Sequence, residues 1–118
     1  MFPGVDIIEI ERFRQACVRR PRLYERLFTA RERERLQGKG VQSWAARFAG
    51  KEAVFKALGT GLSGLSWHDI EILTENSGEP VVVCSERASV LMHARGGTRM
   101  RLSLAHNTSQ AVAMAILF

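Results

Sequence analysis

The stretch "RFAGKEAVFKALGTG", residues 47–61, decides how this chain folds. Its apolar residues recur at helical spacing, and a glycine follows at position 59, so we expect a helix over residues 44–59. Ser43 is a suitable N-cap for this helix, and Gly59 is a suitable C-terminal stop. The apolar stripe is made of Trp44, Phe48, Phe55 and Leu58, with Val54 at its edge.

The same helix carries charged side chains that an ordinary core helix would not need. Glu52 and Lys56 lie one turn apart, beside a row of small residues: Ala45, Ala49 and Gly59. The pair is either a solvent-exposed ion pair or part of a site where a ligand lies against the helix. Lys51 falls inside the apolar stripe, where it either extends its amine to the surface or faces an anion. The exit through Gly59, Thr60 and Gly61 offers a flexible backbone whose N–H groups can approach a phosphate.

The rest of the chain predicts an α+β fold in a single domain over residues 1–118. Thr29 followed by Glu32 fits a capping box, which predicts a helix start. The final strand is apolar on both faces, so it is expected in the centre of the sheet or at an interface. Strands are expected within 3–10, 67–75, 80–84, 99–106 and 109–118, mostly antiparallel, and shorter helices within 11–28, 29–40 and 85–97.

Charge and composition restrict the class of partner. The chain of 118 residues has 17 Lys and Arg against 12 Asp and Glu, a net charge of +5. Such an excess favours an acidic partner: a nucleic acid, an anionic membrane, an acidic protein or a phosphorylated ligand. The two cysteines lack metal-ligand spacing and are read as reduced thiols. No segment is long enough to span a membrane, so we expect a cytoplasmic protein that does not bind membranes.

Asp6 interrupts a run of β-branched residues near the start of the chain. Its carboxylate either points outward from the strand or pairs with Glu52 to bind a hard cation. Mg²⁺ is commonly held by one or two carboxylates, with water and substrate phosphate completing its shell. Two carboxylates without a cluster of His or Cys suit Mg²⁺ and argue against zinc.

Four blocks of sequence together resemble one family. They are "GVDIIEIERF" (4–13), "RFAGKEAVFKALGTG" (47–61), "WHDIEI" (67–72) with "SGEP" (77–80), and "LSLAH" (102–106). In order and spacing they are similar to the small bacterial 4′-phosphopantetheinyl transferases, the holo-[acyl-carrier-protein] synthase family. The resemblance implies transfer of phosphopantetheine from coenzyme A to a serine of an apo acyl carrier protein, with release of adenosine 3′,5′-bisphosphate. It also implies a homotrimer with active sites between subunits.

The resemblance also implies roles for individual residues. Asp6 and Glu52 would bind Mg²⁺, with Mn²⁺ as a possible substitute, and Lys56 would contact the pyrophosphate or the pantetheine phosphate, so these three are the expected catalytic residues. Arg47 and His106 would lie near the 3′-phosphate of coenzyme A, and Gly78 and Pro80 near its adenine. With the residues singled out above, the expected coenzyme A-binding set is Arg47, Lys51, Gly59, Thr60, Gly61, Gly78, Pro80 and His106.

The arginines of the first helical segment are expected to dock the acidic carrier protein. Arginine outnumbers glutamate there, and opposite charges speed encounter and set orientation. The docking set is Arg12, Arg14, Arg19 and Arg20. By contrast, Arg31 to Arg35 alternate with Glu32 and Glu34, and we expect an ordinary solvated helical face there.

The main alternative is a small basic nucleic-acid-binding module, which the net charge alone would permit. The basic segment lacks interleaved aromatic residues, and no RNA-binding motif is present. Asp6 and Glu52 would also repel phosphates unless a metal ion lay between them. We therefore expect no nucleic-acid partner. His68 and His93 are interpreted as structural residues.

Overall fold

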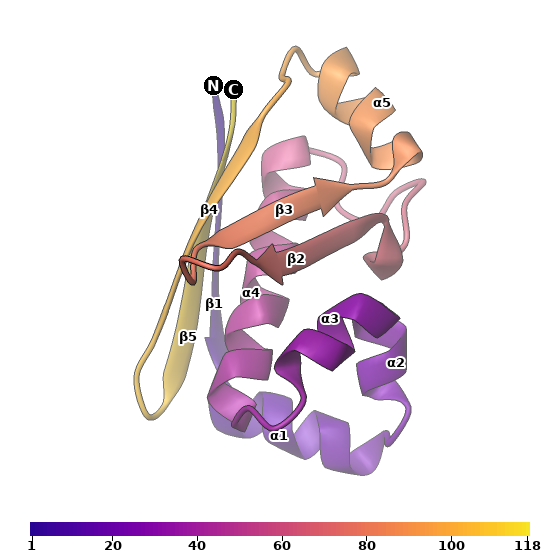
Figure 1. Ribbon diagram of the computed structural model, residues 1–118. Coiled ribbons are helices and arrows are strands. Elements are labelled where there is room, and N and C mark those ends of the chain that lie inside the picture. Colours follow the sequence, from indigo (N-terminus) through magenta and orange to yellow (C-terminus); the bar gives the residue numbers. More distant parts are fainter.

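A three-stranded sheet crossed by one long helix forms the centre of the molecule. The computed structural model describes residues 1–118. In it, β1 (Phe2–Glu9), β5 (Gln110–Leu117) and β4 (Met100–His106) pair antiparallel in the order β1-β5-β4. Helix α4 (Val41–Leu58) covers one face of this sheet and contacts all three strands (Figure 1).

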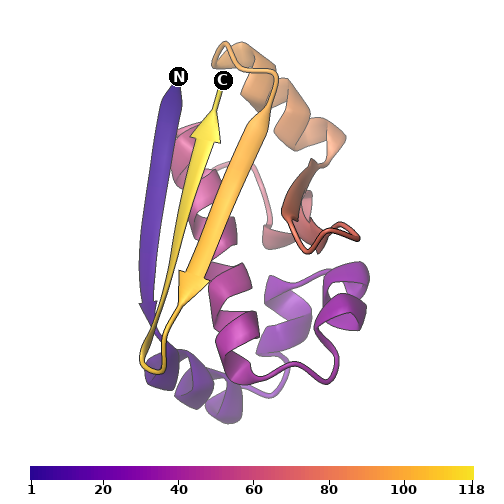
Figure 2. The same ribbon diagram turned by 60° about the vertical axis from the view of Figure 1, so that its left-hand side comes forward.

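The shorter elements surround this centre. Helices α1, α2 and α3 gather at the N-terminal end of α4, a two-stranded hairpin lies on the β4 side, and α5 lies at the far end (Figures 1 and 2). The bounds are α1 (Ile10–Arg19), α2 (Leu23–Leu27), α3 (Ala30–Leu36), a 3₁₀ turn (Trp67–Asp69), β2 (Ile70–Thr74), β3 (Pro80–Cys84) and α5 (Glu86–Ala94). The expected α+β class with antiparallel pairing is confirmed, but the strands form two separate sheets.

The small residues of α4 serve packing against the sheet. Ala45, Ala49 and Ala53 are fully buried. A Cβ added at Gly4 of β1 would lie 2.0 Å from the carbonyl oxygen of Ala53, so the backbones of helix and strand are in direct contact. Ala45 and Ala49 are buried in the core and leave no room for a ligand along the helix, so the interpretation of the row beside Glu52 and Lys56 is wrong for these two residues; Gly59 is exposed at the end of the helix.

The central strand β5 places different sizes of side chain on its two faces. Towards α4 it presents the buried residues Ala111, Ala113 and Ala115. On the opposite face Val112 is 37% exposed and Met114 is 48% exposed. The neighbouring residues Val5 and Ile7 of β1 are 58% and 62% exposed. The outer face of the sheet is thus an exposed apolar surface made of Val5, Ile7, Val112 and Met114.

The boundaries of several helices follow local signals. Thr29 and Glu32 form the expected capping box, and Gly59 ends α4 with a φ of 80°. Ser43 is not the N-cap: α4 begins at Val41 after Gly40, because the chain turns into the helix directly after the preceding glycines. Both cysteines are free thiols. None of the helices combines the length and apolar character needed to cross a lipid bilayer.

Candidate active site

Two carboxylates, Asp6 and Glu52, lie close together between β1 and α4, next to the amine of Lys56. These three residues are called the carboxylate cluster below. Asp6 lies on the helix-facing side of β1 with its side chain 11% exposed, and not on the outer face. Lys56 Nζ donates to Asp6 Oδ1 at 2.9 Å and to the carbonyl oxygen of Val5 at 2.9 Å. Lys56 therefore bridges to the strand, and the expected alternative of a Glu52–Lys56 surface ion pair is not formed.

The Glu52 carboxylate has no direct ion-pair partner. Burial raises the pKa of Glu52, the nearby Asp6 carboxylate raises it further, and Lys56 lowers it in part. Two carboxylates close enough to repel each other, only one of them paired with a lysine, are a suitable pair of oxygen ligands for a divalent cation.

The raised pKa of Glu52 predicts how stability depends on pH in the metal-free protein. The folded state holds the Glu52 proton more tightly than the unfolded state does. Protonation of Glu52 therefore stabilises the folded state at pH values below the unfolded pKa, and this stabilisation is lost as the pH rises through the folded pKa. We expect Glu52→Gln to raise the free energy of unfolding at pH 7.5 in EDTA, and this gain to shrink towards pH 4. Urea denaturation at both pH values measures it; an equal gain at both would contradict the assignment.

A basic pocket lies on the other flank of α4. It has a volume of about 520 Å³, and it brings together four predicted coenzyme A-binding residues: Arg47, Gly78, Pro80 and His106. Arg47 comes from α4, Gly78 and Pro80 from the turn into β3, and His106 from the end of β4. Arg47 Nη2 donates to Thr74 Oγ1 at 2.5 Å, while its Nη1 is buried without a partner. A phosphate oxygen would supply the missing acceptor.

A second cleft of about 330 Å³ adjoins this pocket and shares Arg47 and Gly78 with it. Arg35, Lys39 and Thr74 also line it. Arg35 Nη1 donates to the carbonyl oxygen of Thr74 at 2.9 Å. Arg35 and Lys39 are candidate site residues that were not predicted from the sequence. Arg35 was expected on a solvated face, although Lys39, two residues before the start of the long helix, was a usable signal.

Lys51 lies in the core and cannot contact coenzyme A. Its side chain is 0% exposed, and Nζ lies 2.5 Å from Glu32 Oε1. Burial lowers the pKa of Lys51, and Glu32 opposes this shift. The predicted coenzyme A contact of Lys51 and the expected solvent exposure of Glu32 are therefore both wrong, because each charge neutralises the other inside the protein.

The glycine-rich exit of α4 lies about 18 Å along the helix from Arg47, at about 1.5 Å per residue. The N–H of Gly59 bonds to the carbonyl oxygens of Phe55 and Lys56, so it is not free to bind a phosphate as expected. Arg95 packs against Gly59, where an added Cβ would lie 2.3 Å from Nη1. Thr60 and Gly61 line neither the basic pocket nor the adjoining cleft.

A mainly apolar groove connects Glu52 with two of the predicted docking arginines. Its volume is about 460 Å³, and Arg12 and Arg19 of α1 lie along it with Phe13 and Phe48. Arg14 instead forms an ion pair with Glu11 on the same helix. Arg20 is the exposed C-cap of α1.

The carboxylate cluster and the basic pocket therefore lie on opposite flanks of α4. Arg47 and Glu52 are about 140° apart around the helix, at about 100° per residue. Asp6 belongs to the β1 edge of the sheet and His106 to the β4 edge, with β5 between them (Figure 2). Each chain thus carries two separate halves of the predicted site.

Comparison with known proteins identifies the family. The family model described as the 4′-phosphopantetheinyl transferase superfamily matches residues 3–115. The chain belongs to this superfamily. A curated member from Desulforudis audaxviator, holo-[acyl-carrier-protein] synthase, is 49% identical over 96% of this chain and 88% of the relative.

Solved structures of superfamily members share the fold. Helicobacter pylori holo-[acyl-carrier-protein] synthase in complex with coenzyme A aligns with a TM-score of 0.87 and 28% identity, covering 98% of this chain and 99% of that one. The synthase from Bacillus anthracis, in complex with coenzyme A (3′,5′-ADP), aligns with a TM-score of 0.81 and 33% identity, covering 98% and 94%. The expected fold family is confirmed.

Proposed function

We propose that this chain, as a single domain over residues 1–118, is a holo-[acyl-carrier-protein] synthase. It transfers 4′-phosphopantetheine from coenzyme A to a serine hydroxyl of an apo acyl carrier protein and releases adenosine 3′,5′-bisphosphate. The observation that carries the proposal is the assembly of Arg47, Gly78, Pro80 and His106 around one pocket, from three separate elements. The sequence relative from Desulforudis audaxviator catalyses, by its name, the formation of holo-acyl carrier protein.

In this proposal the basic pocket and the adjoining cleft bind the nucleotide end of coenzyme A. The buried, unpartnered Nη1 of Arg47 donates to a phosphate oxygen, and His106 lies at the same pocket. Arg35 and Lys39 add positive charge beside it. These contacts hold the leaving group, so that the diphosphate extends towards a carboxylate cluster.

The reaction forms a bond between the serine oxygen and the phosphorus on the pantetheine side. The bond from that phosphorus to the oxygen of the adenosine 5′-phosphate breaks, its electron pair stays on that oxygen, and the serine proton passes to solvent water. Asp6 and Glu52 fit a Mg²⁺ ion, since Glu52 has no ion-pair partner and its burial makes its negative charge unfavourable. When bound, Mg²⁺ would supply neutralisation of the diphosphate oxygens. Lys56, held by Asp6 beside the same cluster, orients a phosphate oxygen with its ammonium group.

The groove along α1 is the proposed docking site for the acidic carrier protein. Arg12 and Arg19 line the same groove as Glu52, so a carrier protein bound there would present its serine to the carboxylate cluster. The apolar lining of the groove suits apolar side chains of the carrier's recognition surface. Arg14 and Arg20 would extend the basic rim.

We propose that the complete site forms between subunits of a homotrimer. The two half-sites lie at opposite edges of one sheet, so the β1 edge of one copy must meet the β4 edge of another for one coenzyme A to contact both. Such a head-to-tail contact closes into a ring of three when the rotation between neighbouring copies is one third of a turn. The exposed apolar surface of Val5, Ile7, Val112 and Met114 gives the copies a face to bury.

The direct test mixes the purified protein with coenzyme A, Mg²⁺ and an apo acyl carrier protein and weighs the carrier by mass spectrometry. We expect a mass gain equal to one phosphopantetheine group, and its loss when EDTA is added. Carriers from fatty acid, polyketide and peptide pathways are compared in parallel. No gain on any of them would contradict the proposed activity.

A further inference from the structure

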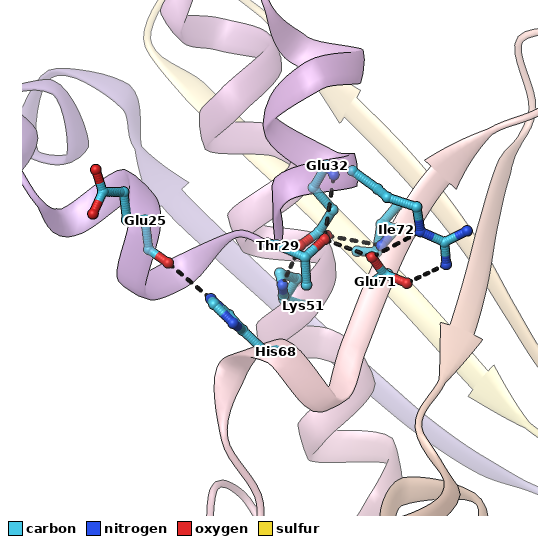
Figure 3. Close-up of polar contacts among 8 residues, drawn as sticks. Glu25, Thr29, Glu32, Lys51, His68, Glu71 and Ile72 are labelled. Atoms are coloured by element: carbon cyan, nitrogen blue, oxygen red, sulfur yellow. Dashed lines mark hydrogen bonds and ion pairs between the residues drawn. The ribbon is translucent and has the colours of Figure 1, made fainter.

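Glu32 is a buried carboxylate that ties three elements together (Figure 3). Its side chain is 1% exposed. Oε1 accepts from Lys51 Nζ of α4 at 2.5 Å and from the N–H of Thr29 at 2.9 Å, and Oε2 accepts from the N–H of Ile72 in β2 at 2.8 Å. One side chain of α3 thus fixes this helix to both α4 and β2.

The same three elements supply residues of the cleft beside the basic pocket. Arg35 of α3 lies one turn after Glu32, Arg47 of α4 lies one turn before Lys51, and Thr74 of β2 follows Ile72 by two residues. Thr74 in turn accepts hydrogen bonds from both arginines. The contacts of Glu32 and the walls of the cleft therefore belong to the same junction between α3, α4 and β2.

Neighbouring contacts strengthen the junction. Glu71, the residue before Ile72, accepts from Thr29 Oγ1 at 2.6 Å and from Arg31 Nη2 at 2.5 Å. Lys51 neutralises Glu32, so the buried carboxylate does not need to take Arg47 as its partner. The guanidinium of Arg47 consequently keeps one nitrogen without a protein acceptor.

We propose that Glu32 is a positioning residue for coenzyme A: through Lys51 and Ile72 it sets the relative positions of Arg35, Arg47 and Thr74, and thereby the affinity for the 3′-phosphate. The proposal rests on the proposed function, because it assigns the nucleotide end of coenzyme A to this cleft. Glu32 does not touch the substrate. It acts through the three walls that it joins.

The test compares coenzyme A with 3′-dephospho-coenzyme A as substrates of the wild type and of Glu32→Gln. Glutamine keeps the shape but has one carbonyl oxygen in place of two charged ones, so part of the junction is lost. We expect KM for coenzyme A to rise about tenfold, equivalent to one weakened charge-assisted hydrogen bond. KM for 3′-dephospho-coenzyme A, kcat and KM for the carrier protein should change less than about twofold.

Asp69→Asn is the matched control. Asp69 is also a buried carboxylate, bonded to Ser66, Ser85 and Arg87, and it lines neither the pocket nor the cleft. The Asp69→Asn substitution should lower the thermal midpoint of unfolding without changing the preference for coenzyme A over 3′-dephospho-coenzyme A. A second variant, Glu32→Met with Lys51→Met, replaces the buried ion pair by apolar side chains, which often restores stability. This double variant should fold, and it should no longer prefer coenzyme A over 3′-dephospho-coenzyme A.

The outcomes separate the two proposals. If the wild type does not distinguish the two substrates, the placement of the 3′-phosphate in this cleft is overturned. If the wild type distinguishes them and both Glu32 variants do so equally well, the positioning role is overturned. A reduced preference in Asp69→Asn as well would show a general effect of stability and would also overturn it.

Discussion

Replacing Glu52 with glutamine is expected to reduce phosphopantetheine transfer about 1000-fold at millimolar Mg²⁺, because one of the two proposed oxygen ligands loses its charge. Glutamine has almost the same shape, so α4 and its contact with β1 should remain intact. The metal-free variant should be no less stable than the wild type, since burial and Asp6 already disfavour a charge at this position. Initial rates over a range of Mg²⁺ concentrations, measured by mass spectrometry of the carrier, test the expectation.

The matched control is Glu34→Gln on α3, an exposed glutamate that lines none of the described pockets. It makes the same chemical change on the same protein and should leave the rate within about twofold of the wild type. Circular dichroism verifies that both variants are folded. A fully active Glu52→Gln protein would mean that residues 6 and 52 do not bind the metal.

Two inactive variants are expected to restore activity when their subunits are mixed. One chain carries Glu52→Gln and so lacks the carboxylate half of the site. The other carries Arg47→Met and His106→Ala and so lacks the basic half. If each site takes one half from each of two subunits, random mixing of equal amounts leaves about one quarter of the sites intact. Co-expression with two different tags, followed by sequential purification and a transfer assay, measures the recovery.

The control places all three substitutions in one chain and co-expresses it with the variant lacking the basic half. No mixture of these two chains can supply an intact basic half, so no activity should return. Equal amounts of the two single-defect proteins mixed without subunit exchange should also stay inactive. Failure of recovery in a proven mixed assembly would show that each site is built within one chain.

Local signals in the sequence predicted the parts of the fold that depend on neighbouring residues. The capping box of Thr29 and Glu32 and the stop at Gly59 are examples, because their atoms lie within one turn of each other. The resemblance also predicted that Arg47, Gly78, Pro80 and His106 belong together, and the structure gathers them around one pocket.

The errors concern residues whose surroundings are set by distant parts of the chain. Judged from its own helix alone, Glu32 is predicted to be solvated. Judged from its position in the apolar stripe, Lys51 is predicted to contact a ligand. Only the packing of α3 against α4 reveals that they neutralise each other. Likewise, Ala45 and Ala49 of α4 suggest open space beside the helix until the packing of the whole chain buries them. Neither contact has a signal within a short window of sequence.

Strand β5 has an unusual arrangement of side-chain sizes: alanines point into the core of the chain, and valine and methionine point out of it. Its larger apolar side chains therefore gain little from folding of a lone chain. In an assembly that covers this face, folding and association become one thermodynamic event, and the melting temperature then depends on protein concentration. Diluting such a protein shifts the equilibrium towards unfolded, separate chains.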